Sequence, residues 1–219
     1  MAGVAGRTVL IAGATSASGL AAARTLTAAG AGVIAVGRDA AKLAALSAGA
    51  RGEVCDLSDE DAVAALAGRL RGDGVRVDGV LHLVGGWRGG GGLAGQTDAD
   101  YRFLEHGFTA LRHVSRAFDA DLRASDAGRL AIVSSTAVQR PLAGGANYAA
   151  VKAASEAWTR AVAHGFAKAA RDADEPLRAA AVTFRVKALD GLEQALADAF
   201  VGLWDVDAAD VNDAVIPLA

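Results

Sequence analysis

Three side chains in the middle of the chain have the types and spacing of a proton-transfer site. Ser135 stands thirteen residues before Tyr148, and Lys152 follows Tyr148 by four. Residues four apart share one face of a helix. A free tyrosine has a pKa of about 10, and a neighbouring ammonium lowers it by favouring the phenolate. Tyr148 can then act as a general acid or base, while Ser135 hydrogen-bonds the oxygen whose charge changes.

The segments around these residues predict a strand and a helix that hold them. Residues 130–133 form an apolar run with β-branched members, typical of a strand buried on both faces, and Ser135 ends it. After a loop with Pro141 and two glycines, the Ala-rich residues 147–163 predict a helix that carries the tyrosine and the lysine. Such a pair also occurs by chance on exposed helices, so the rest of the chain must decide between a site and a surface pair.

The N-terminal part has the pattern of a β-α-β unit. Residues 8–12 and 33–36 are short apolar runs, and residues 20–29 between them have helical composition. Small residues in the turn before the helix let the backbone approach a pyrophosphate, which the amides of the helix N-terminus can hold. A merely tight strand–helix turn is the alternative. The candidate nucleotide contacts in this turn are Gly13, Thr15, Ser16, Ala17, Ser18 and Gly19.

The order of these parts resembles the short-chain dehydrogenase/reductase family. The turn has the spacing of that family's T-G-x-x-x-G-x-G motif, with Ala12 for the threonine and Ala17 for the middle glycine. The serine, tyrosine and lysine described above stand at the family's spacing. The resemblance covers residues 8 to about 165 in order and the last stretch loosely. It implies a Rossmann-like, doubly wound α/β fold of three layers, with about seven mainly parallel strands and helices on both faces.

The resemblance also implies an activity. Members of the family transfer a hydride between NADPH and the carbonyl carbon of a ketone, or in the reverse direction from an alcohol. Tyr148 would give the substrate oxygen a proton, Ser135 would hold that oxygen, and Lys152 would also hydrogen-bond the nicotinamide ribose. The cofactor supplies the hydride, and the protein supplies position and electrostatics. Relatives assemble through their long helices and last strand, so we expect a homodimer or homotetramer.

Further candidate cofactor contacts follow the second, third and fourth strands. A glycine replaces the acid that NAD-preferring relatives carry, and the next residue is Arg38, which can pair with the 2′-phosphate of NADP. Asp56 and Leu57 follow the third strand, where the family's aspartate binds the adenine. Gly85 and Gly86 let the chain pass close to the nicotinamide ribose. We therefore expect NADP(H), with NAD(H) as the other possibility.

Several positions depart from the family pattern. His82 replaces the first asparagine of the family's Asn-Asn-Ala-Gly, and we interpret it as a hydrogen-bonded strut. Gly107 falls where relatives carry an asparagine that holds a water in the proton path, so proton supply to the lysine must take another route. Phe184 and Arg185 stand in place of Pro-Gly after a predicted strand at 177–182. The helical substrate lid of the family is missing or nearly so.

The candidate substrate contacts lie near the most glycine-rich run of the chain. Residues 89–92 are four successive glycines, which suit a mobile loop bordering the ligand crevice. Trp87 can lie over a substrate there or anchor the loop to the core. Leu142 is the second candidate, and Leu93 and Val138 add apolar surface. We expect a small-molecule or carrier-bound carbonyl substrate.

Three helix starts are predicted from capping residues. Ser58 would cap a helix at 59–70, and Thr97 would cap the helix that runs to about residue 122. Asp190 and Glu193 form a capping-box pattern before the last long helix. Two of the candidate cofactor contacts have alternative roles. Asp56 can serve as a cap beside Ser58, and Arg38 can be a solvated charge at the start of the next helix.

Composition bounds the remaining possibilities. The 219 residues are 53% hydrophobic and 21% charged, which fits one globular domain over residues 1–219. A net charge of −3 without a polybasic run gives no footprint for nucleic acid, and we identify no metal-ligating cluster. The lone Cys55 suits a reducing compartment, and no apolar run is long enough to cross a membrane. We therefore expect a cytoplasmic protein with no membrane partner.

The fold alone does not choose among three functions. The first is an active carbonyl reductase with an open site. The second is a nucleotide-binding protein that senses NADPH or holds a partner and has little turnover. The third is a structural unit whose nucleotide binding is vestigial. Retention of the serine, the tyrosine and the lysine favours the enzyme, because a sensor has no need of all three.

Overall fold

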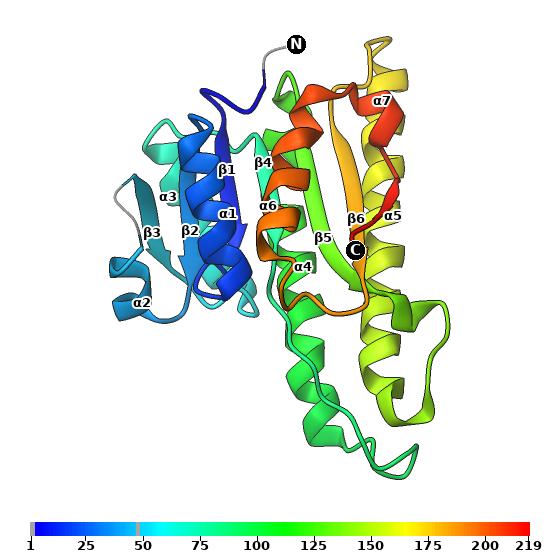
Figure 1. Ribbon diagram of the computed structural model, residues 1–219. Helices are drawn as coiled ribbons and strands as arrows, with labels where there is room; N and C mark the ends of the chain where they lie inside the picture. The colour runs from blue at the N-terminus through cyan, green and yellow to red at the C-terminus, as the bar shows by residue number, and fades with distance from the viewer. Residues whose placement is uncertain (1–2, 47–48) are drawn as a thin grey trace.

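One parallel sheet forms the centre of the molecule. The computed structural model describes residues 3–46 and 49–219 (Figure 1). Its seven strands run in the order β3-β2-β1-β4-β5-β6-β7, and every neighbouring pair is parallel. The predicted doubly wound α/β fold is confirmed. The strands are β1 (Thr8–Ala12), β2 (Gly32–Gly37), β3 (Ala50–Val54), β4 (Gly79–His82), β5 (Arg129–Ser135), β6 (Ala180–Val186) and β7 (Val215–Pro217).

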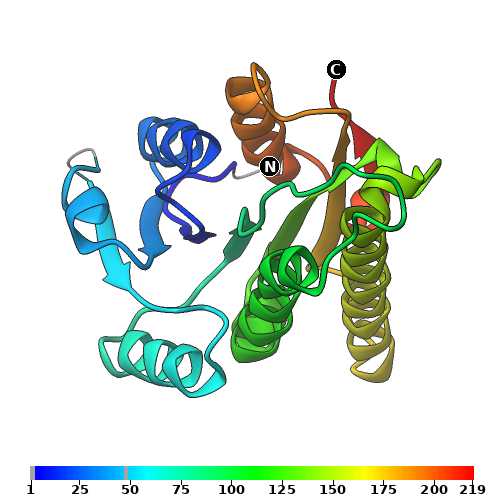
Figure 2. The ribbon, with the colours of Figure 1, turned by 90° about the horizontal axis from the view of Figure 1, so that it is seen from below.

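Helices cover both faces of the sheet, as Figure 2 shows along the strands. α1 and α6 pack on one face, and α3, α4 and α5 pack on the other. The helices are α1 (Ala17–Ala28), α2 (Ala40–Ala44), α3 (Glu60–Gly72), α4 (Asp98–Ala124), α5 (Ala146–Asp172), α6 (Glu193–Val201) and α7 (Ala208–Val211), and short 3₁₀ turns lie at Thr136–Val138, Ala143–Gly145 and Gly202–Asp205. Among the described residues, no helix combines the length and apolar character needed to cross a bilayer.

The central strands are apolar on both sides because each side faces a helical layer. In β1, Val9 and Ile11 pack in the core beneath α1 and α6, whereas Leu10 and Ala12 pack in the core beneath α3, α4 and α5. All four are fully buried. Burial of each large aliphatic side chain contributes about 1.5–3 kcal/mol, so this alternation holds both layers to one sheet.

Capping residues were predicted correctly at only one of the three helix starts. Thr97 caps α4, since its Oγ1 accepts a hydrogen bond from the amide of Asp100 at 3.1 Å. The predicted cap at Ser58 is wrong, because Asp59 caps α3 and the Ser58 hydroxyl donates to Asp56 Oδ1 at 2.7 Å. The predicted capping box before the last long helix is also wrong, because α6 begins without a side-chain cap.

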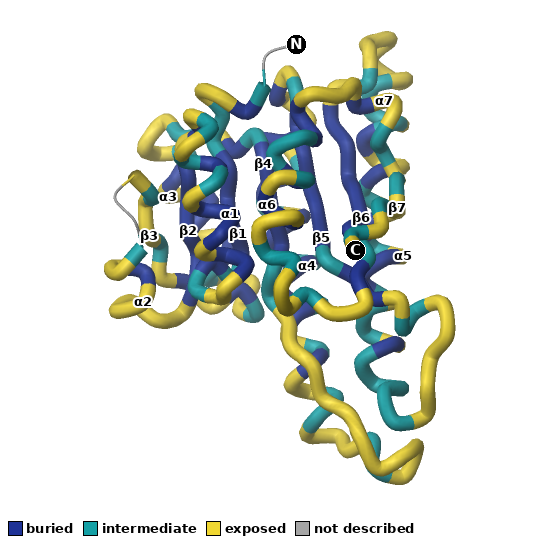
Figure 3. Tube along the Cα trace, in the orientation of Figure 1, coloured by how far each residue is buried: buried dark blue, intermediate teal, exposed yellow. Residues whose placement is uncertain are grey.

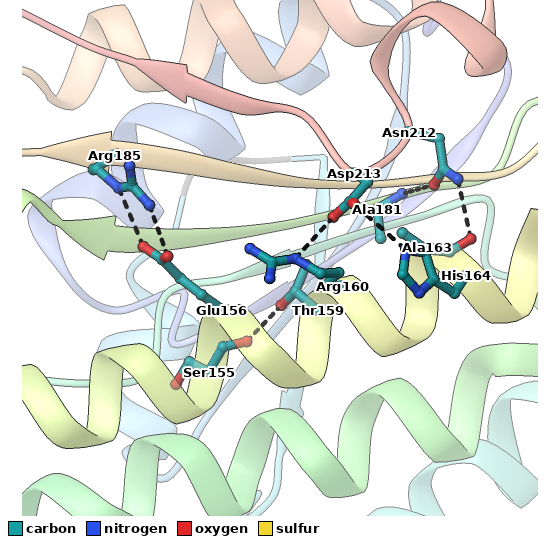
Figure 4. Close-up of polar contacts among 10 residues, drawn as sticks. All are labelled: Ser155, Glu156, Thr159, Arg160, Ala163, His164, Ala181, Arg185, Asn212 and Asp213. Atoms are coloured by element: carbon teal, nitrogen blue, oxygen red, sulfur yellow. Dashed lines mark hydrogen bonds and ion pairs between the residues drawn. The ribbon is translucent and has the colours of Figure 1, made fainter. Parts of the chain in front are cut away.

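The prediction for β6 is wrong at its end. Phe184 and Arg185 lie inside the strand rather than after it. Consecutive side chains of a strand point to opposite faces, and each of these two side chains packs against a partner on its own face. Phe184 is fully buried in the core beneath α6. Arg185 points to the other face and pairs with Glu156 of α5, with Nη2 2.7 Å from Oε2 and Nε 3.2 Å from Oε1 (Figure 4).

The two longest helices extend beyond the carboxyl edge of the sheet. α4 and α5 lie side by side, and their N-terminal halves project past the ends of the strands in Figure 1. The surface of this projection is largely exposed, as Figure 3 shows. The segments 83–97 and 136–145 lead into these helix starts. Residues that follow β4 and β5 are thereby brought to one edge of the sheet.

Candidate active site

A cleft of about 1120 Å³ opens at the carboxyl edge of the sheet. Ligand sites of open parallel sheets lie at this edge. The serine that ends β5 meets the tyrosine and the lysine of α5 in the cleft, although the segments that carry them are separated by a loop. Of the predicted site residues, the cleft brings together Ser16, Ser18, Gly85, Gly86, Trp87, Ser135, Leu142, Tyr148 and Lys152.

The other predicted cofactor contacts lie outside the lining of the cleft. Asp56 and Arg38 follow β3 and β2 along the same sheet edge. Hydrogen bonds from Ser58, and then the charge of Arg38, hold the pKa of the Asp56 carboxyl below its usual range. This edge therefore offers a row of candidate contacts that continues past the cleft. The predicted residues outside the lining are Gly13, Thr15, Ala17, Gly19, Arg38, Asp56 and Leu57.

Ser135 and Tyr148 line the cleft together, and the Ser135 hydroxyl acts on the pKa of the Tyr148 phenol. The Ser135 oxygen also accepts a hydrogen bond from the amide of Ala137 at 3.2 Å, which orients the hydroxyl at the end of β5. Burial raises the pKa of the Tyr148 phenol above its usual value, and the Ser135 hydroxyl acts in the opposite direction. The phenol is therefore held in its protonated form, which is the form that donates.

Lys152 stands four residues after Tyr148, but the pKa of the phenol is raised and not lowered, contrary to the expectation from this spacing. Its Nζ donates to the Val133 carbonyl at 2.7 Å and lies 5.8 Å from the centre of the Tyr148 ring. Burial lowers the pKa of the Lys152 ammonium to about 8, and Glu156 opposes this shift. The lysine is thus itself desolvated, and burial of the phenol outweighs its effect on the tyrosine.

The turn between β1 and α1 has the geometry of a phosphate cradle. Gly13 has a φ of +88°, and a Cβ added at Gly19 would lie 2.5 Å from the Ala14 carbonyl. Ser16 caps α1, since its Oγ accepts from the Gly19 amide at 3.1 Å. Glycines at these two positions let the backbone close tightly on the sheet, so an anion can approach the first amides of α1. The residues present therefore fit the phosphates of a dinucleotide.

The family model described as short chain dehydrogenase matches residues 7–170. The chain belongs to this family. A comparison with curated proteins gives no match. Among solved structures, one described as a short chain dehydrogenase from Pseudomonas syringae is 21% identical, with a TM-score of 0.86 over 99% of this chain and 96% of that one.

Two further similar structures hold NADP. One is described as a gluconate 5-dehydrogenase from Burkholderia cenocepacia in complex with NADP and tartrate, with 20% identity, a TM-score of 0.82 and coverage of 98% and 94% of the two chains. The other is described as a short chain dehydrogenase from Shigella flexneri complexed with NADP, with 20% identity, a TM-score of 0.85 and coverage of 99% and 98%. At these identities the similarity supports the shared fold of the short-chain dehydrogenases.

His82 of this short-chain dehydrogenase lies at the end of β4 and is 6% exposed. Its Nε2–H donates to the Gly107 carbonyl of α4 at 3.0 Å, so the interpretation of His82 as a hydrogen-bonded strut is confirmed. Burial is the main cause that lowers the pKa of the imidazole to about 4, and the Lys152 charge adds to it, whereas the Gly107 and Val84 backbone groups act in the opposite direction.

At Gly107 the backbone of α4 packs against the backbone of Val84, in the segment that follows β4. A Cβ added there would lie 2.9 Å from the Val84 carbonyl oxygen, which is backbone and has little freedom to move. We therefore expect Gly107→Asn, the change that restores the family residue, to lower the free energy of unfolding by about 1–3 kcal/mol. Thermal and urea unfolding measure this loss.

Gly165→Asn is the matched control for Gly107→Asn, because Gly165 is an exposed glycine of α5 with no atom within 4 Å of an added Cβ. This change should leave stability equal or slightly higher, since glycine is a poor helix former. A Gly107→Asn variant as stable as its control would contradict the packing described here.

Gln96 is a structural residue of the site that the sequence did not indicate. Its Nε2 donates to the Gly144 carbonyl at 3.0 Å and the Gly90 carbonyl at 3.1 Å, and its Oε1 accepts from the Asn147 amide at 3.1 Å. The side chain therefore ties the glycine-rich run to the start of α5. A single glutamine next to glycines carries no recognisable pattern, so only the tertiary contacts show this role.

The mouth of the cleft is apolar and open. Trp87 is 62% exposed and Leu142 is 69% exposed, so the alternative in which Trp87 anchors the loop to the core is wrong. Leu93 and Val138, which were expected to add apolar surface, do not line the cleft. Sequence reasoning missed a further group of lining residues. They end β6 or lie in the segments that come after β5 and β6, so their positions gave a signal: Gln139, Arg140, Val186, Lys187, Ala188, Leu189 and Asp190.

Proposed function

We propose that this chain is an NADP(H)-dependent oxidoreductase that moves a hydride between the nicotinamide and the carbonyl carbon of a ketone, or from the corresponding alcohol. The observation that carries the proposal is the meeting of Ser135, Tyr148 and Lys152 in one cleft. Ser16 and Ser18 of the phosphate-cradle turn lie in the same cleft, so a cofactor held there can reach the trio. Family membership supports the oxidoreductase class.

The proposed reduction uses the protonation states found in the site. Tyr148 gives its phenolic proton to the substrate oxygen, and the Ser135 hydroxyl donates a hydrogen bond to the same oxygen. The raised pKa of Tyr148 keeps the donor form populated at neutral pH. The Lys152 ammonium then stabilises the tyrosinate by its charge. When bound, NADPH supplies the hydride. Oxidation of an alcohol runs through the same groups in reverse.

The open mouth supports a bulky or carrier-bound carbonyl substrate. Only the segment 187–192 connects β6 to α6, so no helical lid closes this side of the cleft within the described residues. The exposed faces of Trp87 and Leu142 offer apolar surface to such a substrate. Arg140 and Lys187 add positive charge to the lining, which suits an acidic group on the substrate or its carrier.

Arg38 is the proposed contact for the 2′-phosphate. It follows Gly37, the last residue of β2, which stands where NAD-preferring relatives carry an acid. We expect Arg38→Ala to weaken NADPH binding about 10- to 100-fold and NADH binding less than about twofold, because a hydrogen bond to a charged group contributes about 1.5–3 kcal/mol. Titration of nicotinamide fluorescence measures both affinities.

Arg24→Ala serves as the control for the cofactor test, because Arg24 is an exposed arginine of α1 that does not line the cleft. It should change neither affinity. Equal losses of NADPH and NADH binding in Arg38→Ala would show that Arg38 does not contact the 2′-phosphate.

The second candidate function is a weakly active NADPH sensor or partner-binding protein. Gly107 favours it, because the family's asparagine in the proton path is absent. Addition of ketones and quinones to the NADPH-loaded protein separates the two candidates. Oxidation of NADPH by any of these compounds supports the reductase. Selective binding without oxidation supports the sensor, and no binding of either nucleotide would leave a structural role.

The remaining proposals concern the state of the protein. We propose one domain, since strands from Thr8 to Pro217 share a single sheet. We propose a homodimer or homotetramer in the cytoplasm, with α4, α5 and the edge strand β7 as the contact surfaces. Light scattering of the purified chain measures the assembly.

A further inference from the structure

A second, much smaller cavity adjoins the cleft. Its volume is about 20 Å³, and its lining includes His82, Gly107, Tyr148, Lys152 and Ser155. A cavity holds a water when it offers about 10–15 Å³ to the centre of the molecule and two to four polar partners. This cavity therefore has the size for one water. His82, Tyr148 and Lys152 line both spaces, so this water would lie next to the proposed proton-transfer site.

We propose that His82 is a positioning residue that holds one buried water beside Lys152, and that this water returns a proton to the lysine during turnover. The inference rests on the proposed oxidoreductase function. It supplies the alternative route that the absence of the family's asparagine requires. The histidine comes from β4, whereas the asparagine of relatives would come from α4.

The hydrogen bonding of His82 leaves one nitrogen available for the water. Because the Gly107 carbonyl can only accept, Nε2 must carry the proton, and Nδ1 then carries a lone pair. Nδ1 is buried and has no hydrogen-bond partner within the described residues. A buried acceptor left unpaired costs about 1–3 kcal/mol. A water in the small cavity would remove this cost.

Lys152 can supply the second partner of the water. One of its three N–H groups donates to the Val133 carbonyl at 2.7 Å, which leaves two for other acceptors. The water can accept from Nζ while it donates one hydrogen to His82 Nδ1. Ser155 donates its own hydroxyl hydrogen to the Val151 carbonyl at 2.9 Å, so its oxygen can accept the other hydrogen of the water.

The proton balance of the step involves no change at His82. After Lys152 has given a proton toward the tyrosinate, the water turns the O–H that pointed to Ser155 toward the neutral amine and passes that proton to it. In the same step the oxygen of the water takes a proton from solvent in the cleft, so no free hydroxide forms. The net result is transfer of one solvent proton to the amine. His82 does not carry the proton, because a group with a pKa of about 4 is almost entirely neutral at pH 7.

The glycine in α4 and the histidine in β4 are complementary. Without a side chain, Gly107 leaves its carbonyl open to the imidazole and avoids the Val84 carbonyl. The imidazole fills the neighbouring space and presents a second nitrogen. This pair of residues therefore explains how the site keeps a polar group there without the asparagine.

Two isosteric variants separate the water-holding role from the strut role. His82→Asn keeps a polar atom near the position of Nδ1 and loses the donor to Gly107. His82→Gln keeps a donor near the position of Nε2 and loses the acceptor at Nδ1. We expect His82→Gln to lower kcat by about 10- to 100-fold with little change in KM, and His82→Asn to stay within about threefold of the wild type. If His82 acted only as a strut, His82→Asn would be the more impaired variant, and this order would overturn the proposal.

Nitrogen NMR of the histidine-labelled apo protein tests the site without turnover. The chain has four histidines, so the His82 signals are identified by their loss in His82→Gln. We expect a neutral ring protonated at Nε2 from pH 5.5 to 8, and magnetisation transfer from a long-lived water to the ring. A ring protonated at Nδ1, or no bound water, would overturn the proposal.

The outcomes also separate this inference from the proposed function. A dry cavity in an active reductase would overturn only the water. An inactive wild type with the bound water would overturn the oxidoreductase proposal and the relay step, and would leave the water site standing. Thermal unfolding of both variants identifies any loss of kcat that comes from misfolding.

Discussion

Replacing Tyr148 by phenylalanine is expected to lower turnover by about 10²- to 10⁴-fold, while the affinity for NADPH stays nearly unchanged. The change removes the phenolic proton donor and leaves the ring in place. Tyr148 is the acid in the proposed mechanism, and its burial, which raises the pKa of the phenol, keeps the proton that this role requires. The phenylalanine ring fills the same space as the tyrosine ring. The fold should therefore be kept, and the loss should fall on kcat.

Oxidation of NADPH with the best ketone measures the effect of Tyr148→Phe, and nicotinamide fluorescence measures the binding. The matched control is Tyr101→Phe, because Tyr101 of α4 is the other tyrosine of the chain and does not line the cleft. It should retain full activity. Undiminished turnover in Tyr148→Phe would contradict the assigned mechanism. A loss of NADPH affinity as large as the loss of turnover would mean that the hydroxyl serves cofactor binding instead.

Removing the charge of Glu156 is expected to destabilise the fold by about 3–5 kcal/mol, because Arg185 would be left buried without a counter-charge. The Glu156 and Arg185 side chains are 9% and 17% exposed. They form a bidentate pair between α5 and β6, with both guanidinium contacts at 3.2 Å or less. Figure 4 shows the pair beside Thr159, whose hydroxyl donates to the Ser155 carbonyl at 2.9 Å.

Urea unfolding of Glu156→Gln measures this loss, and a double variant shows its cause. Glu156→Leu combined with Arg185→Met should recover most of the stability, because replacing a whole buried ion pair by apolar residues is often neutral. Asp172→Asn, which breaks the exposed pair with Lys168 on the same helix, is the control and should cost less than about 1 kcal/mol. If Glu156→Gln cost less than about 1 kcal/mol, water would have to reach the pair of Glu156 and Arg185 and screen its charges.

The same substitution links the fold to the site. Glu156 stands one helical turn after Lys152 and raises the pKa of its ammonium against the effect of burial. Without the carboxylate, the ammonium should lose its proton at a lower pH. The buried pair therefore holds β6 against α5 and also keeps the charge of the lysine.

The sequence alone was enough to predict the architecture and the three residues that meet at the centre of the site. Strand and helix periods, turn residues and the spacing of Ser135, Tyr148 and Lys152 are local features, and local features set which segments form elements and which residues end them. In a parallel sheet the ends of the strands meet at one edge. The order of the elements was therefore enough to bring the serine of β5 to the tyrosine and the lysine of α5.

The pKa values and the contacts of those residues depend on the tertiary structure. The pKa of Tyr148 rises because of burial, and burial depends on every segment that covers it. The contact of His82 with the Gly107 carbonyl spans 25 residues, and that of Arg185 with Glu156 spans 29. Neither follows from a periodic pattern, because each depends on the distance between two layers of the fold. Electrostatics and close packing are properties of the assembled layers, so the chemistry of the site was settled only when the sheet and its helices came together.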